Sequence, residues 1–395
     1  MASLPLRSIG LLILVIVTAL IGWRLIGPEW RALLADPPKN KDVLFWNQSQ
    51  RDAGFRMLDR LSLVTKTNKI TATTQRELPQ GLPLKLDMNF DAYFEENRHS
   101  AVVILHKGKI RMERYGLDFS DAGRWTSFSV GKSITSTLVG AAIKDGYIES
   151  VDTPVTRYIP ELSQSPYKDV TIEQLLTMTS GVGWTEDYKD PTTDVARFAN
   201  HKAQDGLPQI VSYMRNLSRA HPPGDVWNYS TGETNLIGIL VANAVDRPLA
   251  TYLSEKIWAP YGMEQDATWL LGGDGRELSG CCIQAATRDM ARFGQFLLEG
   301  GKINGTSILP DGWIDTATRK HAQSSRAGLG YGYQWWSYDN GAFAAVGIFG
   351  QGIYIDPSTD LVIAVNSSWT TAKGDEDGEY DRREAFYQAV RAAVK

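Results

Sequence analysis

The sequence contains little cysteine and little histidine. Its 395 residues include 2 Cys and 5 His, with no C-x-x-C or H-E-x-x-H arrangement. The two cysteines, Cys281 and Cys282, are neighbours in the chain, and a disulfide between them would close a strained ring. We therefore expect two free thiols, no disulfide framework, and neither a metal site nor another cofactor.

An excess of charge of one sign is also lacking. The chain carries 41 Lys and Arg against 45 Asp and Glu, which gives a formal net charge of -4. Because surfaces that bind phosphate backbones are rich in cations, we expect no nucleic-acid partner and instead a small-molecule ligand. Hydrophobic residues make up 43% of the chain, enough for a large core. At roughly 150 residues per domain, length alone predicts two or three domains.

The longest uncharged apolar run lies at the amino terminus, from Ile9 to Trp23. A membrane-spanning helix needs about 20 residues, whereas the apolar region of a signal peptide has about 7–15. Three interpretations of residues 1–26 stay open: an uncleaved membrane anchor, a cleaved signal peptide and a buried helix. The first two place the rest of the chain outside the cytoplasm, either membrane-anchored or secreted. Residues 27–50, interrupted by a Pro-Pro pair, are predicted to be a tether.

Residues 51–395 are predicted to form one two-lobed domain. Strand-like runs separated by turn residues cover 101–115, 331–338, 342–349, 352–356 and 361–366. Helical spacing covers 133–145, 172–178, 207–217, 234–245, 248–257 and 288–299, and also 87–98 and 382–394. Strands near both ends and helices between them predict an α/β (α+β) fold. Its antiparallel sheet comes from both termini and is flanked by helices, with a helical lobe inserted at about 133–300.

The first chemically informative motif is S-x-x-K at Ser129 and Lys132. If Ser129 begins a helix, Lys132 lies three residues on along the same face, beside the hydroxyl. A serine hydroxyl becomes a nucleophile when a base removes its proton, and a lysine with a lowered pKa is such a base. The alternative is a helix cap followed by a solvated lysine. A second match, Ser165 to Lys168, lies in a proline-containing loop and is interpreted as a surface turn.

Two further segments add candidate groups. The segment P-P-G-D-V-W-N-Y-S contains Tyr229 just before a predicted helix. A phenol beside a lysine can shuttle protons, although a buried structural tyrosine fits the pattern equally. The segment G-I-F-G-Q-G contains Gly347, Ile348 and Gly350 among strand residues, where glycine often marks close approach of a ligand. The backbone N–H groups of Ser129 and Ile348 are candidate donors to an oxyanion.

These three segments, in this order and spacing, resemble the serine β-lactamase and penicillin-binding-protein superfamily. Within it, the chain is similar to the class C-like branch that includes esterases and 6-aminohexanoate-dimer hydrolases. Two more segments support the resemblance: L-L-T-M-T-S-G at 175–181, and T-R-D-M-A-R-F-G at 287–294. The resemblance covers about residues 95–370 and implies a β-lactamase-like fold.

The resemblance also implies roles for individual residues. Ser129 would be the acylated nucleophile, Lys132 its base and Tyr229 the proton shuttle, with the Ser129 and Ile348 N–H groups as oxyanion hole. Tyr188 would overhang the site and donate a hydrogen bond to a leaving nitrogen, or else be a surface aromatic. The resemblance also places the Cys281–Cys282 pair near the floor of the site.

The chain departs from the family pattern where lactamases and peptidases carry K-T-G, since it has Ala345, Val346 and Gly347 there. No cation or hydroxyl is left at that place to bind a substrate carboxylate. We therefore expect a serine hydrolase that cleaves carboxylic esters or linear amides through an acyl-enzyme on Ser129. The alternatives are a β-lactamase or D-Ala-D-Ala peptidase-like enzyme, and a membrane-tethered sensor that is acylated but does not turn over.

Overall fold

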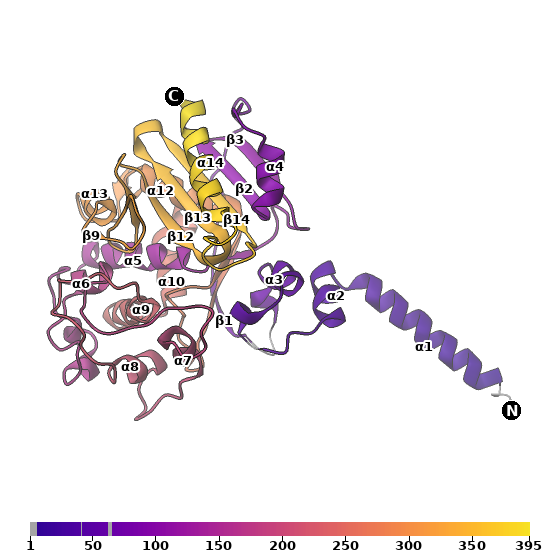
Figure 1. Ribbon diagram of the computed structural model, residues 1–395, viewed down its shortest axis with the longest axis horizontal. Helices are drawn as coiled ribbons and strands as arrows, with labels where there is room; N and C mark the ends of the chain where they lie inside the picture. Colours follow the sequence, from indigo (N-terminus) through magenta and orange to yellow (C-terminus); the bar gives the residue numbers. More distant parts are fainter. Residues whose placement is uncertain (1–5, 41, 62–64) are drawn as a thin grey trace.

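The computed structural model describes residues 6–40, 42–61 and 65–395, and an eight-stranded antiparallel sheet lies at its centre (Figure 1). The strand order is β3-β2-β14-β13-β12-β11-β10-β9. The strands are β2 (His99–His106), β3 (Lys109–Tyr115), β9 (Ala322–Gln323), β10 (Leu329–Tyr331), β11 (Trp336–Tyr338), β12 (Phe343–Gly347), β13 (Gln351–Asp356) and β14 (Leu361–Ser367). Leu361 of β14 pairs with His106 of β2. The sheet thus joins segments from both ends of the chain, which confirms the predicted fold class.

Turn residues set the hairpins of this sheet. Lys107 and Gly108 both have left-handed backbone, with φ of 53° and 70°, and reverse the chain between β2 and β3. Between β13 and β14, an Asp356 carboxylate oxygen accepts a hydrogen bond from the Ser358 N–H at 2.9 Å. Asp360 then takes φ of 50°, which aspartate tolerates better than most residues. The Asp356–Asp360 turn separates the two runs, 352–356 and 361–366, that the sequence predicted as strands.

One predicted strand is interrupted. The run 331–338 forms the end of β10 and all of β11, because Gln334 between them has a left-handed φ of 64°. The Gln334 amide fixes this bend: it donates to the Leu176 carbonyl at 2.9 Å and accepts from the Thr234 hydroxyl at 2.7 Å. The alternating sequence pattern predicted a continuous strand, and a side-chain contact with the helical lobe overrides it.

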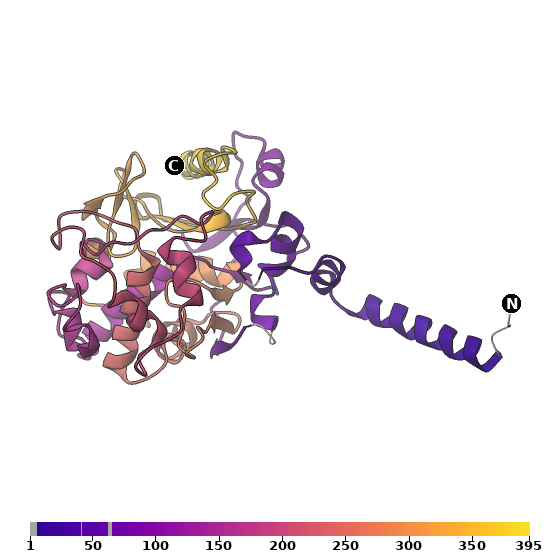
Figure 2. The ribbon, with the colours of Figure 1, turned by 60° about the horizontal axis from the view of Figure 1, so that its bottom comes forward.

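Both faces of the sheet are covered by helices. Ile104 of β2 packs with α4 (Phe90–Glu96) and α14 (Glu379–Val394) on one face. The next residue, Leu105, points to the other face, toward α12 (Thr287–Leu298). Because neighbouring side chains on a strand point to opposite faces, a strand buried on both sides is apolar throughout. Figures 1 and 2 show α14 and α4 together on one side of the sheet.

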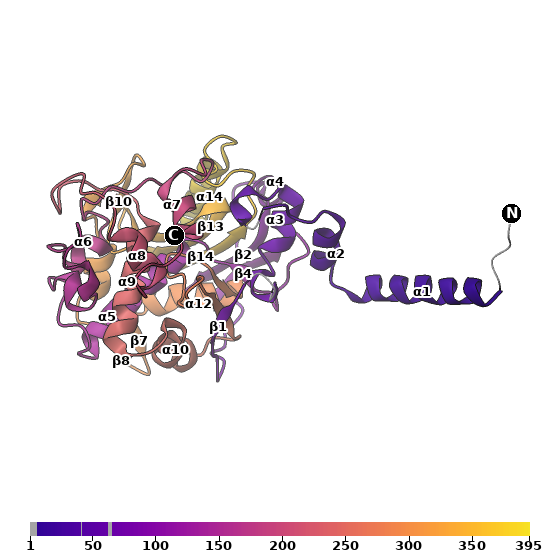
Figure 3. The same ribbon diagram turned by 90° about the horizontal axis from the view of Figure 1, so that it is seen from below.

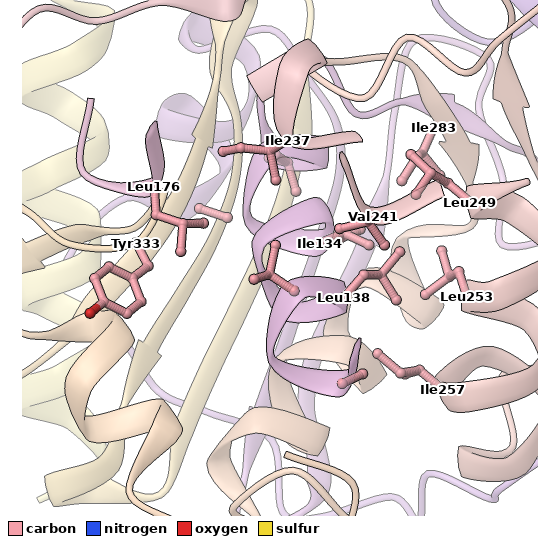
Figure 4. Packing of buried hydrophobic residues seen from close by; sticks show 14 of the residues in the cluster. Ile134, Leu138, Leu176, Ile237, Val241, Leu249, Leu253, Ile257, Ile283 and Tyr333 are labelled. Carbon is pink, nitrogen blue, oxygen red and sulfur yellow. The ribbon is translucent and has the colours of Figure 1, made fainter. Parts of the chain in front are cut away.

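The inserted helical lobe lies beside the sheet and is built around two helices, α5 (Val130–Lys144) and α9 (Thr231–Val245), which pack against each other. Figure 4 shows Leu138 of α5 and Val241 of α9 in one buried apolar cluster. The other helices of this lobe are α6 (Ile172–Leu176), α7 (Asp194–Asn200), α8 (Gln209–Met214), α10 (Leu249–Leu253) and α11 (Ala259–Tyr261). Helix α13 (Trp313–Thr318) follows the lobe in the chain. The amino termini of α5 and α9 carry the residues of the candidate site.

A second, four-stranded sheet was absent from the sequence prediction. Its order is β1-β5-β6-β4, with β1 (Thr67–Ile70), β4 (Trp125–Thr126), β5 (Ala267–Leu270) and β6 (Ile283–Ala285). Two short strands, β7 (Lys302–Ile303) and β8 (Thr306–Ser307), form a separate hairpin.

The segment predicted as a tether contains α2 (Pro28–Ala35) and continues into α3 (Gln48–Gly54). Its Leu33 and Trp46 belong to a buried cluster with Leu270 of β5.

The amino-terminal helix α1 (Leu6–Leu25) projects away from the rest of the chain (Figures 1 and 3). Its apolar side chains are exposed, among them Leu20 and Leu25. Among the described residues, none of the helices alone combines the length and the hydropathy of a membrane span. Two pairs of helices joined at a sharp bend reach that length and hydropathy together: Ile13–Leu25 with α2, and α9 with Leu249–Tyr261. The anchor or signal role of residues 1–26 stays a prediction.

The close approach of α9 to the loop before β6 generates a first prediction. A Cβ atom on Gly238 would collide with the Ser279 side chain, which is fully buried. We expect Gly238→Ala to lower the free energy of unfolding by about 1–3 kcal/mol, the usual cost of overpacking a core. Urea unfolding measures this loss. Gly22→Ala, in open space on α1, is the matched control, and equal stability of the two variants would contradict the packing argument.

Candidate active site

Ser129 and Lys132 lie at the start of α5, as the sequence predicted. Ser129 directly precedes the helix, and the Lys132 ammonium donates a hydrogen bond to its hydroxyl oxygen at 3.0 Å. Phe128, just before the serine, has a left-handed φ of 41°. Such strain in a residue other than glycine often occurs at functional sites, where the surrounding fold holds it. Lys132 is 1% exposed and Ser129 8% exposed.

Three acceptors surround the Lys132 ammonium. Besides Ser129, it donates to the Thr231 hydroxyl of α9 at 2.9 Å and to the Gly280 carbonyl at 2.7 Å. Burial lowers the pKa of Lys132 to about 8, and the negative charge of Glu186 partly opposes this shift. A substantial fraction of the amine is therefore neutral slightly above pH 7, so Lys132 can accept a proton.

Tyr229 comes next to this pair from the segment before α9. The Lys132 ammonium lies 5.2 Å from the centroid of its ring, and the ring stacks on Trp336 with centroids 6.0 Å apart. Burial raises the pKa of the Tyr229 phenol, and hydrogen bonding with Ser129 and the charge of Arg326 partly oppose the rise. Resting Tyr229 is thus a neutral phenol with a proton to give.

The end of β12 lies against the loop before α5. A Cβ atom on Gly347 would lie 2.7 Å from the Ser127 carbonyl oxygen, so only glycine lets this strand approach the loop before α5. Gly347 and Ile348 line the same cavity as Ser129. Gly350 does not line it: with φ of 90°, it packs against the indole of Trp369. The substrate-binding prediction for Gly350 is therefore replaced by a structural role.

Glu186 is the main polar residue that sequence reasoning missed. One carboxylate oxygen accepts from the hydroxyls of Tyr188 and Thr231, both at 2.5 Å. The other accepts from the Thr231 N–H and the Trp184 indole N–H, both at 2.7 Å. Glu186 thus links Tyr188 to Thr231 and, through that hydroxyl, to Lys132. In the sequence, the one indication that Glu186 belongs to the site was its position two residues before Tyr188, a predicted site residue.

The Cys281 and Cys282 prediction is wrong in one respect. The two residues form a disulfide, and no free cysteine exists in the described chain. Cys282 has left-handed backbone, with φ of 75°. The pair does lie near the floor of the site, as predicted: a Cβ atom on Gly131 would lie 3.3 Å from the Cys281 carbonyl carbon. The adjacent Gly280 supplies the carbonyl that holds Lys132.

These groups open onto one cavity of about 600 Å³. The predicted residues that line it are Ser129, Tyr188, Tyr229, Gly347 and Ile348, and Lys132 is buried beside Ser129. In the described ranges, no group of three or more His, Cys, Asp and Glu side chains could hold a metal ion. The site therefore places a hydroxyl, a partly neutral amine and a phenol beside a cavity large enough for a small organic molecule.

The sequence profile of the Beta-lactamase family matches residues 90–388, and the chain belongs to this family. The 6-aminohexanoate-dimer hydrolase of Paenarthrobacter ureafaciens is 29% identical over 290 residues, which cover 70% of this chain and 74% of that protein. Esterase EstB of Burkholderia gladioli is 29% identical over 204 residues, covering 46% and 50%. A Bacillus anthracis structure, provisionally described as a 6-aminohexanoate-dimer hydrolase, aligns with a TM-score of 0.76 and 25% identity, covering 87% and 94%. The family thus includes esterases, amide hydrolases and β-lactamases, and this chain is related to hydrolases.

The disulfide gives a second prediction. Thiol titration of the unfolded chain with Ellman's reagent should find no reactive thiol before reduction and two per chain afterwards. Cys282→Ala should show one thiol under both conditions, because its partner has been removed. Two thiols in the unreduced chain would restore the free-cysteine interpretation.

Proposed function

We propose that this protein is a serine hydrolase that cleaves carboxylic ester or linear amide bonds through an acyl-enzyme on Ser129. The observation that carries the proposal is the buried Lys132 amine, 3.0 Å from the Ser129 hydroxyl oxygen. A lysine in solution is protonated at neutral pH, but burial lowers the pKa of this one to about 8. The related esterase and 6-aminohexanoate-dimer hydrolase support the bond types.

The geometry supports a two-step mechanism. Neutral Lys132 takes the proton of Ser129, whose oxygen attacks the carbonyl carbon of the substrate. The N–H groups of Ser129 and Ile348 would stabilise the oxyanion. Tyr229 gives its proton to the leaving oxygen or nitrogen and regains one from Lys132. In the second step, neutral Lys132 takes a proton from water through Tyr229, and the water oxygen attacks the acyl carbonyl carbon. The bond to the Ser129 oxygen breaks, the proton returns to that oxygen, and the acid leaves.

Ester or linear amide substrates fit better than β-lactams because of Val346. This residue lies in β12 at the K-T-G place and lines the cavity with an aliphatic side chain. It offers neither a cation nor a hydroxyl to a β-lactam carboxylate. A β-lactamase or peptidase would hydrolyse nitrocefin or a D-Ala-D-Ala peptide, and an acylated sensor would show one burst without further release.

The location of the enzyme belongs to this proposal. The uncharged run from Ile9 to Trp23 supports a catalytic domain outside the cytoplasm, either anchored or secreted. The exposed apolar side chains of α1 are consistent with a membrane partner.

Covalent labelling tests the nucleophile. A fluorophosphonate probe should label the wild-type protein, and Ser129→Ala should lose labelling and ester turnover because the attacking oxygen is gone. The second S-x-x-K match provides the matched control, since Ser165 donates to the Leu162 carbonyl and Lys168 is exposed. Ser165→Ala should keep its label. Labelling that persists in Ser129→Ala would overturn the assignment.

The pH profile tests the base. Lys132 acts as its neutral form, so kcat/KM should rise with pH through a pKa of about 8. Glu186→Gln removes the negative charge that raises this pKa, and the rising limb should move to lower pH by about one unit. Glu161→Gln, at an exposed position, is the control. A rising limb that stays in place or moves to higher pH in Glu186→Gln would contradict the role of Glu186.

A further inference from the structure

One of the three acceptors that hold the Lys132 ammonium lies in a loop. Ser129 and Thr231 stand at the starts of α5 and α9, where helical hydrogen bonds fix the backbone. The Gly280 carbonyl lies in the loop between β5 and β6, and its contact with the ammonium, at 2.7 Å, is the shortest of the three. This acceptor serves Lys132 only while the loop keeps the carbonyl pointing at the amine.

Gly280 cannot fix the direction of its carbonyl by itself. A Cβ atom at this position would lie 2.7 Å from the Thr231 Cγ2 atom, so the close approach of the loop to α9 requires glycine. Glycine, however, has the widest choice of backbone conformations. The Gly280 N–H donates to the Asn235 side-chain oxygen at 3.0 Å, which places the residue but leaves its carbonyl free to turn. The restraint on the carbonyl must therefore come from the residues that follow.

The peptide group that carries this carbonyl continues directly into the disulfide. Its N–H belongs to Cys281 and donates to the Leu278 carbonyl at 3.1 Å. The ring that the two sulfurs close contains the next peptide bond, between Cys281 and Cys282. The Cys282 carbonyl then accepts from the Leu270 N–H of β5 at 3.1 Å. The bridge thus lies between the lysine acceptor and a strand of the small sheet.

Opening the bridge would release the loop at Cys282 in particular. This residue has φ of 75°, a left-handed conformation that a cysteine in an open chain rarely adopts. Cys281 and Cys282 are partly exposed, whereas Gly280 before them and Ile283 after them are buried. A small dithiol can therefore approach the bridge, and the reduced chain can turn at the one place where two buried residues flank it.

The same loop keeps water away from the amine. Gly280 and Lys132 are both buried. The backbone of Cys281 packs directly on α5, because a Cβ atom on Gly131 would lie 3.3 Å from the Cys281 carbonyl carbon. No layer of water fits between loop and helix at this contact. The desolvation of Lys132 thus depends on the position of the loop.

We propose that the Cys281–Cys282 disulfide is a positioning element for Lys132, which directs the Gly280 carbonyl at the ammonium and excludes water, so that the enzyme is fully active only while the bridge is closed. The inference rests on the proposed function and adds a covalent requirement to it. Neither cysteine lines the cavity, so both act through the lysine. A dithiol reductant opens the bridge by exchange: its own two sulfurs are oxidised to a disulfide, and Cys281 and Cys282 gain two electrons and two protons as thiols.

Opening the bridge should raise the pKa of Lys132. Burial is the main cause of its lowering to about 8, and water that replaces the carbonyl both accepts from the ammonium and solvates it. The titratable groups of the described chain that face the amine are Glu186, whose charge already raises this pKa, and the neutral phenol of Tyr229. Reduction adds the thiols of Cys281 and Cys282, and a thiolate there acts in the same direction.

The pH dependence of kcat/KM tests the proposal on the full chain, with p-nitrophenyl butyrate as substrate. Dithiothreitol should move the rising limb to higher pH by about one unit, which lowers kcat/KM about tenfold at pH 7 and progressively less above about pH 9. The doubly substituted Cys281→Ser, Cys282→Ser protein should show the moved limb without reductant. Dithiothreitol should change it no further, so this variant also controls for effects of the reductant elsewhere.

A disulfide that only stabilises the fold gives a different pattern. Ile363→Val is the matched control, since Ile363 is buried on the α14 face of the sheet and does not line the cavity. It should lower the free energy of unfolding and leave the rising limb in place. Reduced wild-type protein that loses stability against urea while its rising limb stays in place would overturn the proposal. Unchanged kinetics after Ellman's reagent has counted two thiols would overturn it as well.

A direct titration separates this proposal from the reaction. In Ser129→Ala labelled with carbon-13 lysine, the Cε resonance that Lys132→Arg removes reports the protonation of the amine without turnover. Its midpoint should lie near pH 8 in the oxidised protein and about one unit higher after reduction. That shift without fluorophosphonate labelling of the wild-type serine would refute the hydrolase and keep the positioning role. Labelling and turnover with a midpoint that reduction leaves in place would refute the positioning role alone.

Discussion

Burial of one ammonium group is the constraint on which the site depends. Lys132 is almost wholly removed from solvent, and a buried charge without partners costs several kcal/mol. Its acceptors come from three places: Ser129 before α5, Thr231 at the start of α9, and Gly280 in the loop before β6. The two helices and the loop must therefore be in place together before the amine can be desolvated. The same desolvation brings its pKa near neutrality.

Local patterns predicted much of this arrangement. The S-x-x-K spacing alone places an amine beside a hydroxyl, because residues three apart share a helix face. The strand-like runs near both ends predicted the large sheet, and its pairing of β2 with β14 confirms them. Gly347 was singled out as a glycine in a strand, and the structure gives the reason, a close approach to the Ser127 carbonyl.

Features that depend on distant contacts were not predictable in this way. Glu186 became part of the site because its loop folds back onto Thr231, and no local pattern encodes that path. The bend at Gln334 is fixed by its amide contacts with α6 and α9. The strands of the small sheet are 2 to 4 residues long, too short for a periodic pattern. The Cys281–Cys282 disulfide needed a backbone conformation that the sequence does not reveal.

The position of β14 within the sheet has a consequence for synthesis of the chain. This strand, which begins at Leu361, lies between β2, which ends at His106, and β13. During translation, β2 and β3 leave the ribosome long before the strand that pairs with the inner edge of β2. Contacts between segments so far apart in sequence form slowly. Until β14 arrives, β2 has an unpaired, apolar edge, so the nascent chain has to be protected from aggregation until residues 361–367 have been synthesised.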